Sequence, residues 1–211
     1  MAEQTVRSQR ATRKPRQAPR PVAIPTALIY EEWDGKPIYY KGYRDVLAGT
    51  KTVEEIMSCS DLQGIIVYLL NGFLYTHLNR KLYTVGTNES GLHLAANNNV
   101  ANDLAIYEKA KIGKLKGKYF SVSPLVVIEV DIKADVGDFG DESSYLFQKA
   151  KKILDFGAQR VIWILTEFRK VFIAEQGQKQ WTITDWDQDV LVMENCVLNI
   201  KTLLDEEEID Y

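Results

Sequence analysis

The segment PLVVIEVDIKAD, residues 124–135, opens with a run of apolar residues and then places Glu129, Asp131 and Lys133 at alternating positions. In a strand, residues two apart point to the same face of the sheet, so two carboxylates and one ammonium are expected on one side. Burying a charge is costly unless the charge is paired or binds a metal. The segment therefore predicts a buried strand, residues 125–133, with a polar function at its far end.

The elements that follow this strand predict a parallel neighbour for it. Leu146, Ala150, Ile153 and Leu154 form a helical stripe that ends before Gly157, and RVIWILT, residues 160–166, is typical of a buried strand. A strand–helix–strand connection within one sheet makes its two strands parallel, with a right-handed crossover.

The elements before it complete the predicted core. A long apolar stripe from Leu62 to Leu74 predicts a helix with Ser60 as its N-cap, and Asp34-Gly35 inside YEEWDGKPIYY predicts a hairpin. Three short strands are expected at residues 81–86, 91–96 and 103–108, with a turn-rich connection, AANNNVAND, between the last two. The chain thus predicts an α/β fold: a mixed β-sheet flanked by helices, with the order αβββαβ.

The charges divide the chain into three parts. Residues 1–25 hold six basic residues and one acidic residue, which predicts a disordered basic arm, either a solubilising tail or an arm that contacts phosphates. Subtracting these from the totals of 26 and 29 leaves 20 basic and 28 acidic residues. A single domain is expected at 26–204 and an acidic tail, DEEEIDY, at 205–211. An acidic body argues against a nucleic-acid partner.

The composition also restricts the cellular setting and the metal. No apolar run is long enough for a membrane span, and the two cysteines form no CxxC pair, so a cytoplasmic protein is expected. With two histidines, a zinc site is hard to assemble.

A lysine-rich segment, EKAKIGKLKGK at residues 108–118, has five lysines and two glycines. A solvated loop is expected here, and a loop that contacts phosphates is the alternative, because glycines let the backbone approach a ligand closely.

Four charged residues stand where packing favours apolar ones, and together with Lys133 they make the candidate site. Glu129 and Asp131 are on the buried strand, Asp103 opens a neighbouring strand, and Lys149 is on or beside the apolar stripe of the following helix. Carboxylates about 6.6 Å apart along one strand and about 4.8 Å apart across strands can surround one ion. Oxygen ligands suit Mg²⁺ or Mn²⁺, and a lysine beside the ion can assist an attacking water. The alternative is a structural network of ion pairs among the same residues.

These residues and their order resemble a known nuclease pattern. Asn102-Asp103 followed by Glu129-Val-Asp131-Ile-Lys133 resembles the signature of the PD-(D/E)XK nuclease superfamily. More narrowly, residues 30–175 resemble the Uma-two family, which is grouped with restriction endonucleases. The likeness rests on the Asp34-Gly35 turn, the helix from Ser60, Asp103, VVIEV with Glu129, and Lys149 eight residues before Gly157.

The resemblance implies a metal-dependent endodeoxyribonuclease that hydrolyses phosphodiester bonds of DNA. It implies that Asp103 and Glu129, with Asp131, bind Mg²⁺ or Mn²⁺, and that Lys149 or Lys133 assists the water. A homodimer is possible, because cutting both strands needs two sites.

The sequence also departs from the family pattern. Asn102 replaces the proline of the PD motif, and Gln63 stands where a histidine is often found. The alternative function is therefore an inactive nuclease-fold protein that binds nucleic acid or a protein partner.

Overall fold

The computed structural model describes residues 23–211, so nearly all of the expected basic arm lies outside the described residues. The helices are α1 (Tyr43–Leu47), α2 (Val53–Met57), α3 (Asp61–His77), α4 (Lys109–Ile112), α5 (Glu142–Asp155) and α6 (Ile200–Glu206). The strands are β1 (Ile29–Trp33), β2 (Lys36–Tyr39), β3 (Tyr83–Ala95), β4 (Asn98–Glu108), β5 (Val126–Val130), β6 (Arg160–Leu165), β7 (Lys170–Glu175), β8 (Thr182–Asp185), β9 (Val190–Met193) and β10 (Cys196–Leu198).

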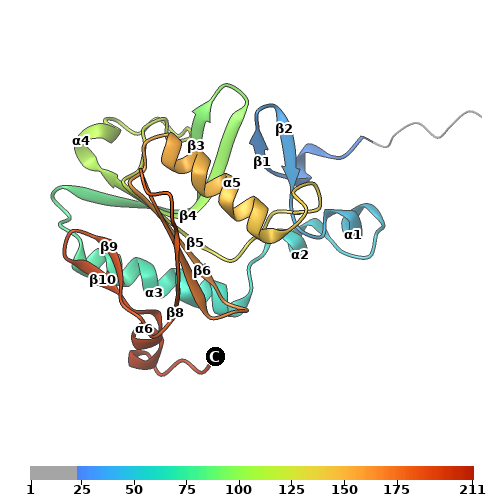
Figure 1. Ribbon diagram of the computed structural model, residues 1–211. Helices are drawn as coiled ribbons and strands as arrows, with labels where there is room; N and C mark the ends of the chain where they lie inside the picture. The colour runs from blue at the N-terminus through green and yellow to red at the C-terminus, as the bar shows by residue number, and fades with distance from the viewer. Residues whose placement is uncertain (1–22) are drawn as a thin grey trace, which may run out of the picture.

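One mixed sheet organises the molecule. Its eight strands run in the order β2-β1-β4-β5-β6-β7-β8, with β3 on the other edge of β4, and β9 and β10 form a separate hairpin. β5 and β6 are parallel, with Val126 opposite Arg160 and Val130 opposite Ile164, while their other neighbours in the sheet are antiparallel. The predicted α/β class, with a mixed sheet flanked by helices, is confirmed (Figure 1).

Helices cover both faces of this sheet (Figure 1). α3 begins where the Ser60 hydroxyl accepts a hydrogen bond from the Gln63 amide at 3.2 Å, as predicted for an N-cap. Its apolar stripe, including Leu70 and Leu74, is buried on one face together with α6. α5 begins at the cap residue Asp141 and packs its own stripe against the opposite face.

Side chains along β5 point alternately to the two faces of the sheet, and this alternation determines which of them pack beneath α3 and which beneath α5. Val126, Ile128 and Val130 belong to the core beneath α3, whereas Val127 belongs to the core beneath α5. By the same period of two, the side chain of Glu129 faces α5. A carboxylate thus enters the interior directly opposite a helix that carries Lys149.

Three expectations about strand boundaries are wrong. The central strand ends at Val130 rather than at residue 133, because Asp131 turns into the left-handed region with φ of 59°. The segments 81–86 and 91–96 form one strand, β3, with an irregularity near Glu89, where φ is 53°. Asp103 lies inside β4 rather than at the start of a strand, because the Asn-rich segment before it joins the ladder with β3.

The last residues pack against the domain. α6 extends to Glu206, and Ile209 and Tyr211 contact the core beneath α3. Arg169 Nη2 donates a hydrogen bond to the Tyr211 carbonyl at 2.7 Å. The expected boundary between a domain at 26–204 and a tail at 205–211 stays a prediction.

Candidate active site at a fork in the sheet

The candidate site occupies a gap in the hydrogen-bond ladder of β4. Along one edge, β4 pairs with β5 from Leu104 to Ile106 and with β1 at Asn99. Between these two pairings the neighbouring strands diverge, and the backbone of residues 101–103 has no strand beside it on that edge. Buried amide and carbonyl groups in such a fork need other hydrogen-bond partners.

Charged side chains provide those partners at Ala101. The Ala101 amide donates to Glu31 Oε1 at 3.0 Å, and the Ala101 carbonyl accepts from Lys149 Nζ at 2.7 Å. Glu31 also accepts hydrogen bonds from the Trp33 indole at 2.9 Å and the Tyr145 hydroxyl at 3.1 Å. Glu31 is therefore a fully engaged buried carboxylate.

The two carboxylates that the sequence singled out replace the next ladder bonds. Asp103 Oδ2 accepts from the Val130 amide at 2.9 Å, and Glu129 Oε2 accepts from the Asp103 amide at 3.4 Å. Asp103 and Glu129 thus each bind the other strand's backbone across the fork. The fork itself brings them together.

Lys149 joins this cluster from α5. Its Nζ lies 2.8 Å from Glu31 Oε1 and 3.0 Å from Glu129 Oε1, and the side chain is 1% exposed. Burial alone would lower the pKa of Lys149, but the carboxylates of Glu129 and Glu31 raise it well above its ordinary value. Lys149 is therefore a permanent buried cation that orients two carboxylates.

Burial dominates the titration of the two candidate ligands. It raises the pKa of Glu129 to about 8, although Lys149 lowers it. Burial also raises the pKa of Asp103, against the Val130 amide and Lys133, which lower it. Both acids lie where a nearby positive charge would stabilise the ionised form.

Lys133 and Glu89 form the open side of the site. Lys133 Nζ lies 3.9 Å from Asp103 Oδ1 and makes an ion pair with Glu89. These three residues line a cavity of about 430 Å³, which the N-terminal part of α3 closes on its other side. Asp103 and Lys133 are therefore accessible to a ligand in the cavity, whereas Glu129 and Lys149 do not line it.

Asp131 is directed away from this cluster, so the expectation that Glu129, Asp131 and Lys133 share one face is wrong. Asp131 Oδ1 accepts from the Thr166 amide at 2.8 Å, and Oδ2 accepts from the Thr166 hydroxyl at 2.7 Å. The left-handed backbone at Asp131 interrupts the strand period. Asp131 ties the end of β5 to the end of β6.

We expect Asp131→Ala to lower the free energy of unfolding by about 2–3 kcal/mol, from two lost hydrogen bonds and a left-handed alanine. Asp131→Asn keeps an acceptor and tolerates that backbone, so a loss below about 1 kcal/mol is expected. Urea denaturation measures both. If Asp131→Asn also removed stabilisation by Mg²⁺, Asp131 would be a ligand rather than a structural residue.

Gln63 contacts the same strand end. Its Nε2 donates to the Val130 carbonyl at 2.7 Å, and the residue is buried. Gln63 therefore holds the end of β5 against α3.

Two acidic residues of the site, Glu31 and Glu89, were not predicted from the sequence. Glu31 had a readable signal, because it precedes the aromatic Trp33 by two residues and so shares its buried face. Glu89 had no such signal. Its position depends on the irregularity of β3, which lies between the two segments that were expected to be separate strands.

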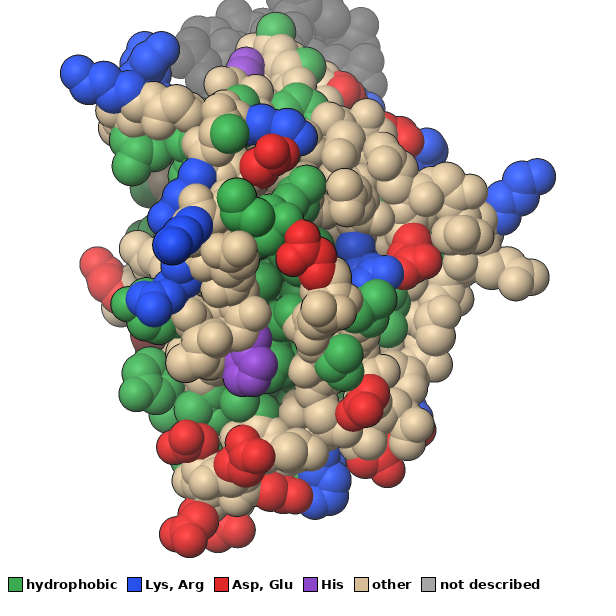
Figure 2. All heavy atoms as spheres, turned by 90° about the vertical axis from the view of Figure 1, so that its left-hand side faces the viewer, with side chains coloured by type: hydrophobic (Ala, Val, Ile, Leu, Met, Phe, Trp, Pro, Cys, Tyr) green, Lys and Arg blue, Asp and Glu red, His purple; other side chains and the backbone are tan. Residues whose placement is uncertain are grey.

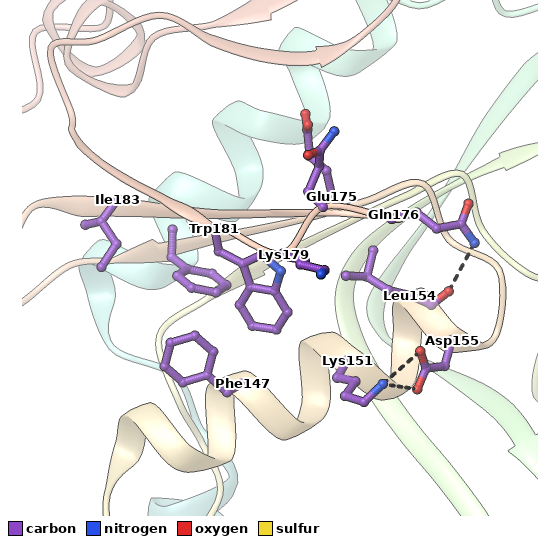
Figure 3. Close-up of a pocket in the computed structure, with 12 residues that line it drawn as sticks. Phe147, Lys151, Leu154, Asp155, Glu175, Gln176, Lys179, Trp181 and Ile183 are labelled. Atoms are coloured by element: carbon purple, nitrogen blue, oxygen red, sulfur yellow. Dashed lines mark hydrogen bonds and ion pairs between the residues drawn. The ribbon is translucent and has the colours of Figure 1, made fainter.

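A larger cavity lies elsewhere and is lined by none of the candidate residues. It has a volume of about 780 Å³ and lies among α5, β7 and β8. Figure 3 shows Phe147 and Trp181 side by side there, and their rings stack with centroids 5.0 Å apart. Lys151 faces Asp155 at its rim, paired at 2.8 Å. Lys151 and Asp155 are already paired with each other there, and size alone does not make a cavity the reactive site.

Two features are absent from residues 23–211. No helix in that range has both the length and the apolar character needed to cross a membrane. No three histidine, cysteine, aspartate or glutamate side chains in that range converge on one point as metal ligands would.

Comparison with known proteins supports the fold. No family model and no curated protein matches the chain. Among solved structures, a protein from Anabaena variabilis ATCC 29413, described as a "putative nuclease belonging to DUF820", is similar with a TM-score of 0.61 and 15% sequence identity. The similarity covers 83% of this chain and 89% of that chain. The chain therefore shares the fold of that protein, while membership of the Uma-two family stays a prediction.

Proposed function

We propose that this protein is a metal-dependent nuclease that hydrolyses phosphodiester bonds of DNA, of the PD-(D/E)XK type and related to the Uma-two family. The observation that carries the proposal is the charge balance at the fork. Four carboxyl groups, from Glu31, Glu89, Asp103 and Glu129, surround two ammonium groups, from Lys133 and Lys149. The acids outnumber the cations even when Glu129, whose pKa burial raises to about 8, is counted as protonated. A surplus of negative charge beside an open cavity favours a divalent cation.

Asp103 and Glu129 suit Mg²⁺ as a pair. Magnesium in phosphate-processing sites is held by one or two carboxylates, with water and substrate phosphate as its other ligands, so a third carboxylate is not required. Asp131 is accordingly left out of the proposed ligand set, because its carboxylate is directed to Thr166 at the end of β6 and away from Asp103 and Glu129. When bound, the ion would supply positive charge that polarises the phosphate and activates water.

The chain's own residues would divide the remaining work. Lys133, which lines the cavity, donates hydrogen bonds to a phosphate oxygen or to the attacking water and stabilises the developing negative charge. Lys149 cannot reach substrate from its buried position, and acts as a positioning residue for Glu129. Gln63 holds the Val130 carbonyl, and so fixes the strand end that carries Glu129.

One observation favours the alternative, an inactive binding protein. Glu129 is 2% exposed and already paired with Lys149, as it would be in a purely structural network. In that case the fold would bind nucleic acid or a protein without cutting.

Plasmid nicking with Mg²⁺ or Mn²⁺ separates the two functions. We expect the wild type to nick DNA and Asp103→Asn to be slower by at least about 100-fold, because metal-ion stabilisation is worth several kcal/mol. Asp45→Asn, which changes an exposed surface acid paired with Lys51, is the matched control and should keep full activity.

A thermal shift tests the metal directly. Mg²⁺ at 100 times its dissociation constant should stabilise the wild type by about 2.7 kcal/mol, and Asp103→Asn should lose this response. Equal nicking by wild type and Asp103→Asn, with no metal response in either, would contradict the nuclease.

A further inference from the structure

Tyr119 is an exposed aromatic residue held flat against β3. A Cβ atom added at Gly91 would lie 2.6 Å from Cγ and Cε1 of the Tyr119 ring, so the ring occupies the space that the glycine leaves open. The next residue fixes this placement, since Phe120 exchanges backbone hydrogen bonds of 2.8 and 2.9 Å with His93 and Gly91. Tyr119 remains 61% exposed, so the outer face of a pre-positioned ring is free.

Three unpaired cations precede this ring. Lys114, Lys116 and Lys118 are exposed, and within residues 23–211 none of them has a carboxylate oxygen within 4.0 Å. Together with His93 and Tyr119 they line a cavity of about 640 Å³. We call residues 114–119 the lysine–tyrosine loop. Basic side chains gather in the upper left of the face in Figure 2, apart from the acidic side chains along its lower rim.

The loop lies next to the candidate active site along β3. Gly91, under the Tyr119 ring, is two residues from Glu89, which pairs with Lys133 at the cavity of Asp103.

We propose that the lysine–tyrosine loop binds an unpaired nucleotide of the nucleic-acid substrate, with the base stacked on Tyr119 and the adjoining phosphates on the three lysines. A flat ring with a free face recognises a base only when that base is not stacked in a duplex. The proposal rests on the proposed nuclease function and specifies its substrate: DNA with a single-stranded segment beside the scissile phosphate. It also gives the acidic chain a local phosphate-binding surface.

Fluorescence anisotropy without divalent metal tests the loop apart from cleavage. The probes are a labelled oligothymidine and a blunt duplex of equal length. We expect the wild type to bind the single strand more tightly, and Tyr119→Leu to weaken that binding about tenfold while changing duplex binding little. Tyr119→Phe should keep wild-type affinity. Tyr75→Leu, which removes a tyrosine of similar exposure from α3, should have no effect.

Two further variants exclude an indirect effect. Gly91→Ala forces the ring from its place and should weaken single-strand binding with Tyr119 intact. The combined substitutions Lys114→Gln, Lys116→Gln and Lys118→Gln should weaken binding to both probes and reduce its salt dependence. Equal binding of the single strand by wild type, Tyr119→Leu and Tyr75→Leu would overturn the loop as a base-binding site, even if nicking requires Asp103. If Asp103→Asn nicks DNA as fast as the wild type while Tyr119→Leu still weakens single-strand binding, the nuclease function is contradicted and the loop remains a base-binding site.

Discussion

Replacing Lys149 with methionine is expected to lower the free energy of unfolding by about 3–5 kcal/mol, measured by urea denaturation. The change leaves Glu31 and Glu129 as two buried carboxylates without their shared cation, and removes the hydrogen bond to the Ala101 carbonyl at 2.7 Å. Removing one partner of a buried ion pair costs far more than the pair contributes, because the remaining charge stays buried and unpaired.

A lysine on the same helix provides the control. Lys152 pairs with Asp34 at 2.7 Å, but the Asp34 side chain is 69% exposed. Solvent screens such a pair, so Lys152→Met should cost no more than about 1 kcal/mol. A similar loss of unfolding free energy from both variants would show that α5 tolerates methionine poorly. The buried ion pairs of Lys149 would then contribute no more to stability than the exposed pair of Lys152.

The network also predicts that the losses are not additive. Glu31→Gln removes one of the two carboxylates beside Lys149, so it should be less harmful in Lys149→Met than in the wild type. The difference in a double-mutant cycle should exceed about 1 kcal/mol. Additive losses would indicate that Glu31 and Lys149 contribute through separate contacts.

The sequence predicted the parts of the site that depend on local periodicity. Lys149 on the apolar stripe of α5 implied a buried ammonium, and Glu129 within an apolar run implied a buried carboxylate. Each follows from one helix or one strand considered alone. The parallel pairing of β5 with β6 followed from the chirality of the connection between them.

What could not be predicted depends on contacts distant in the chain. Asp131 leaves the strand because Thr166, 35 residues later, offers two hydrogen bonds to its carboxylate. Glu31 enters the site because β1 pairs with the start of β4, on the far side of the fork from β5. A fork between strands is a property of the sheet, and its gap determines which charges are drawn inward.

We expect Lys133, rather than Lys149, to assist the chemistry. Its replacement should therefore lower nicking activity without weakening Mg²⁺ binding. Lys133→Met should reduce nicking by about 100-fold, because its ammonium lines the cavity and can donate to the phosphate. The same change removes a positive charge 3.9 Å from Asp103 Oδ1, so Mg²⁺ should bind at least as tightly and the thermal shift should persist or grow.

Lys149→Met should behave differently, measured at a temperature where circular dichroism shows the variant folded. Because Lys149 holds Glu129 at 3.0 Å, its loss should weaken the Mg²⁺ response and the nicking together. Lys133→Arg should recover part of the activity lost in Lys133→Met, since a cation returns to the cavity. Full nicking by Lys133→Met would assign the chemistry to Lys149, which would then have to leave its buried pairs when substrate binds.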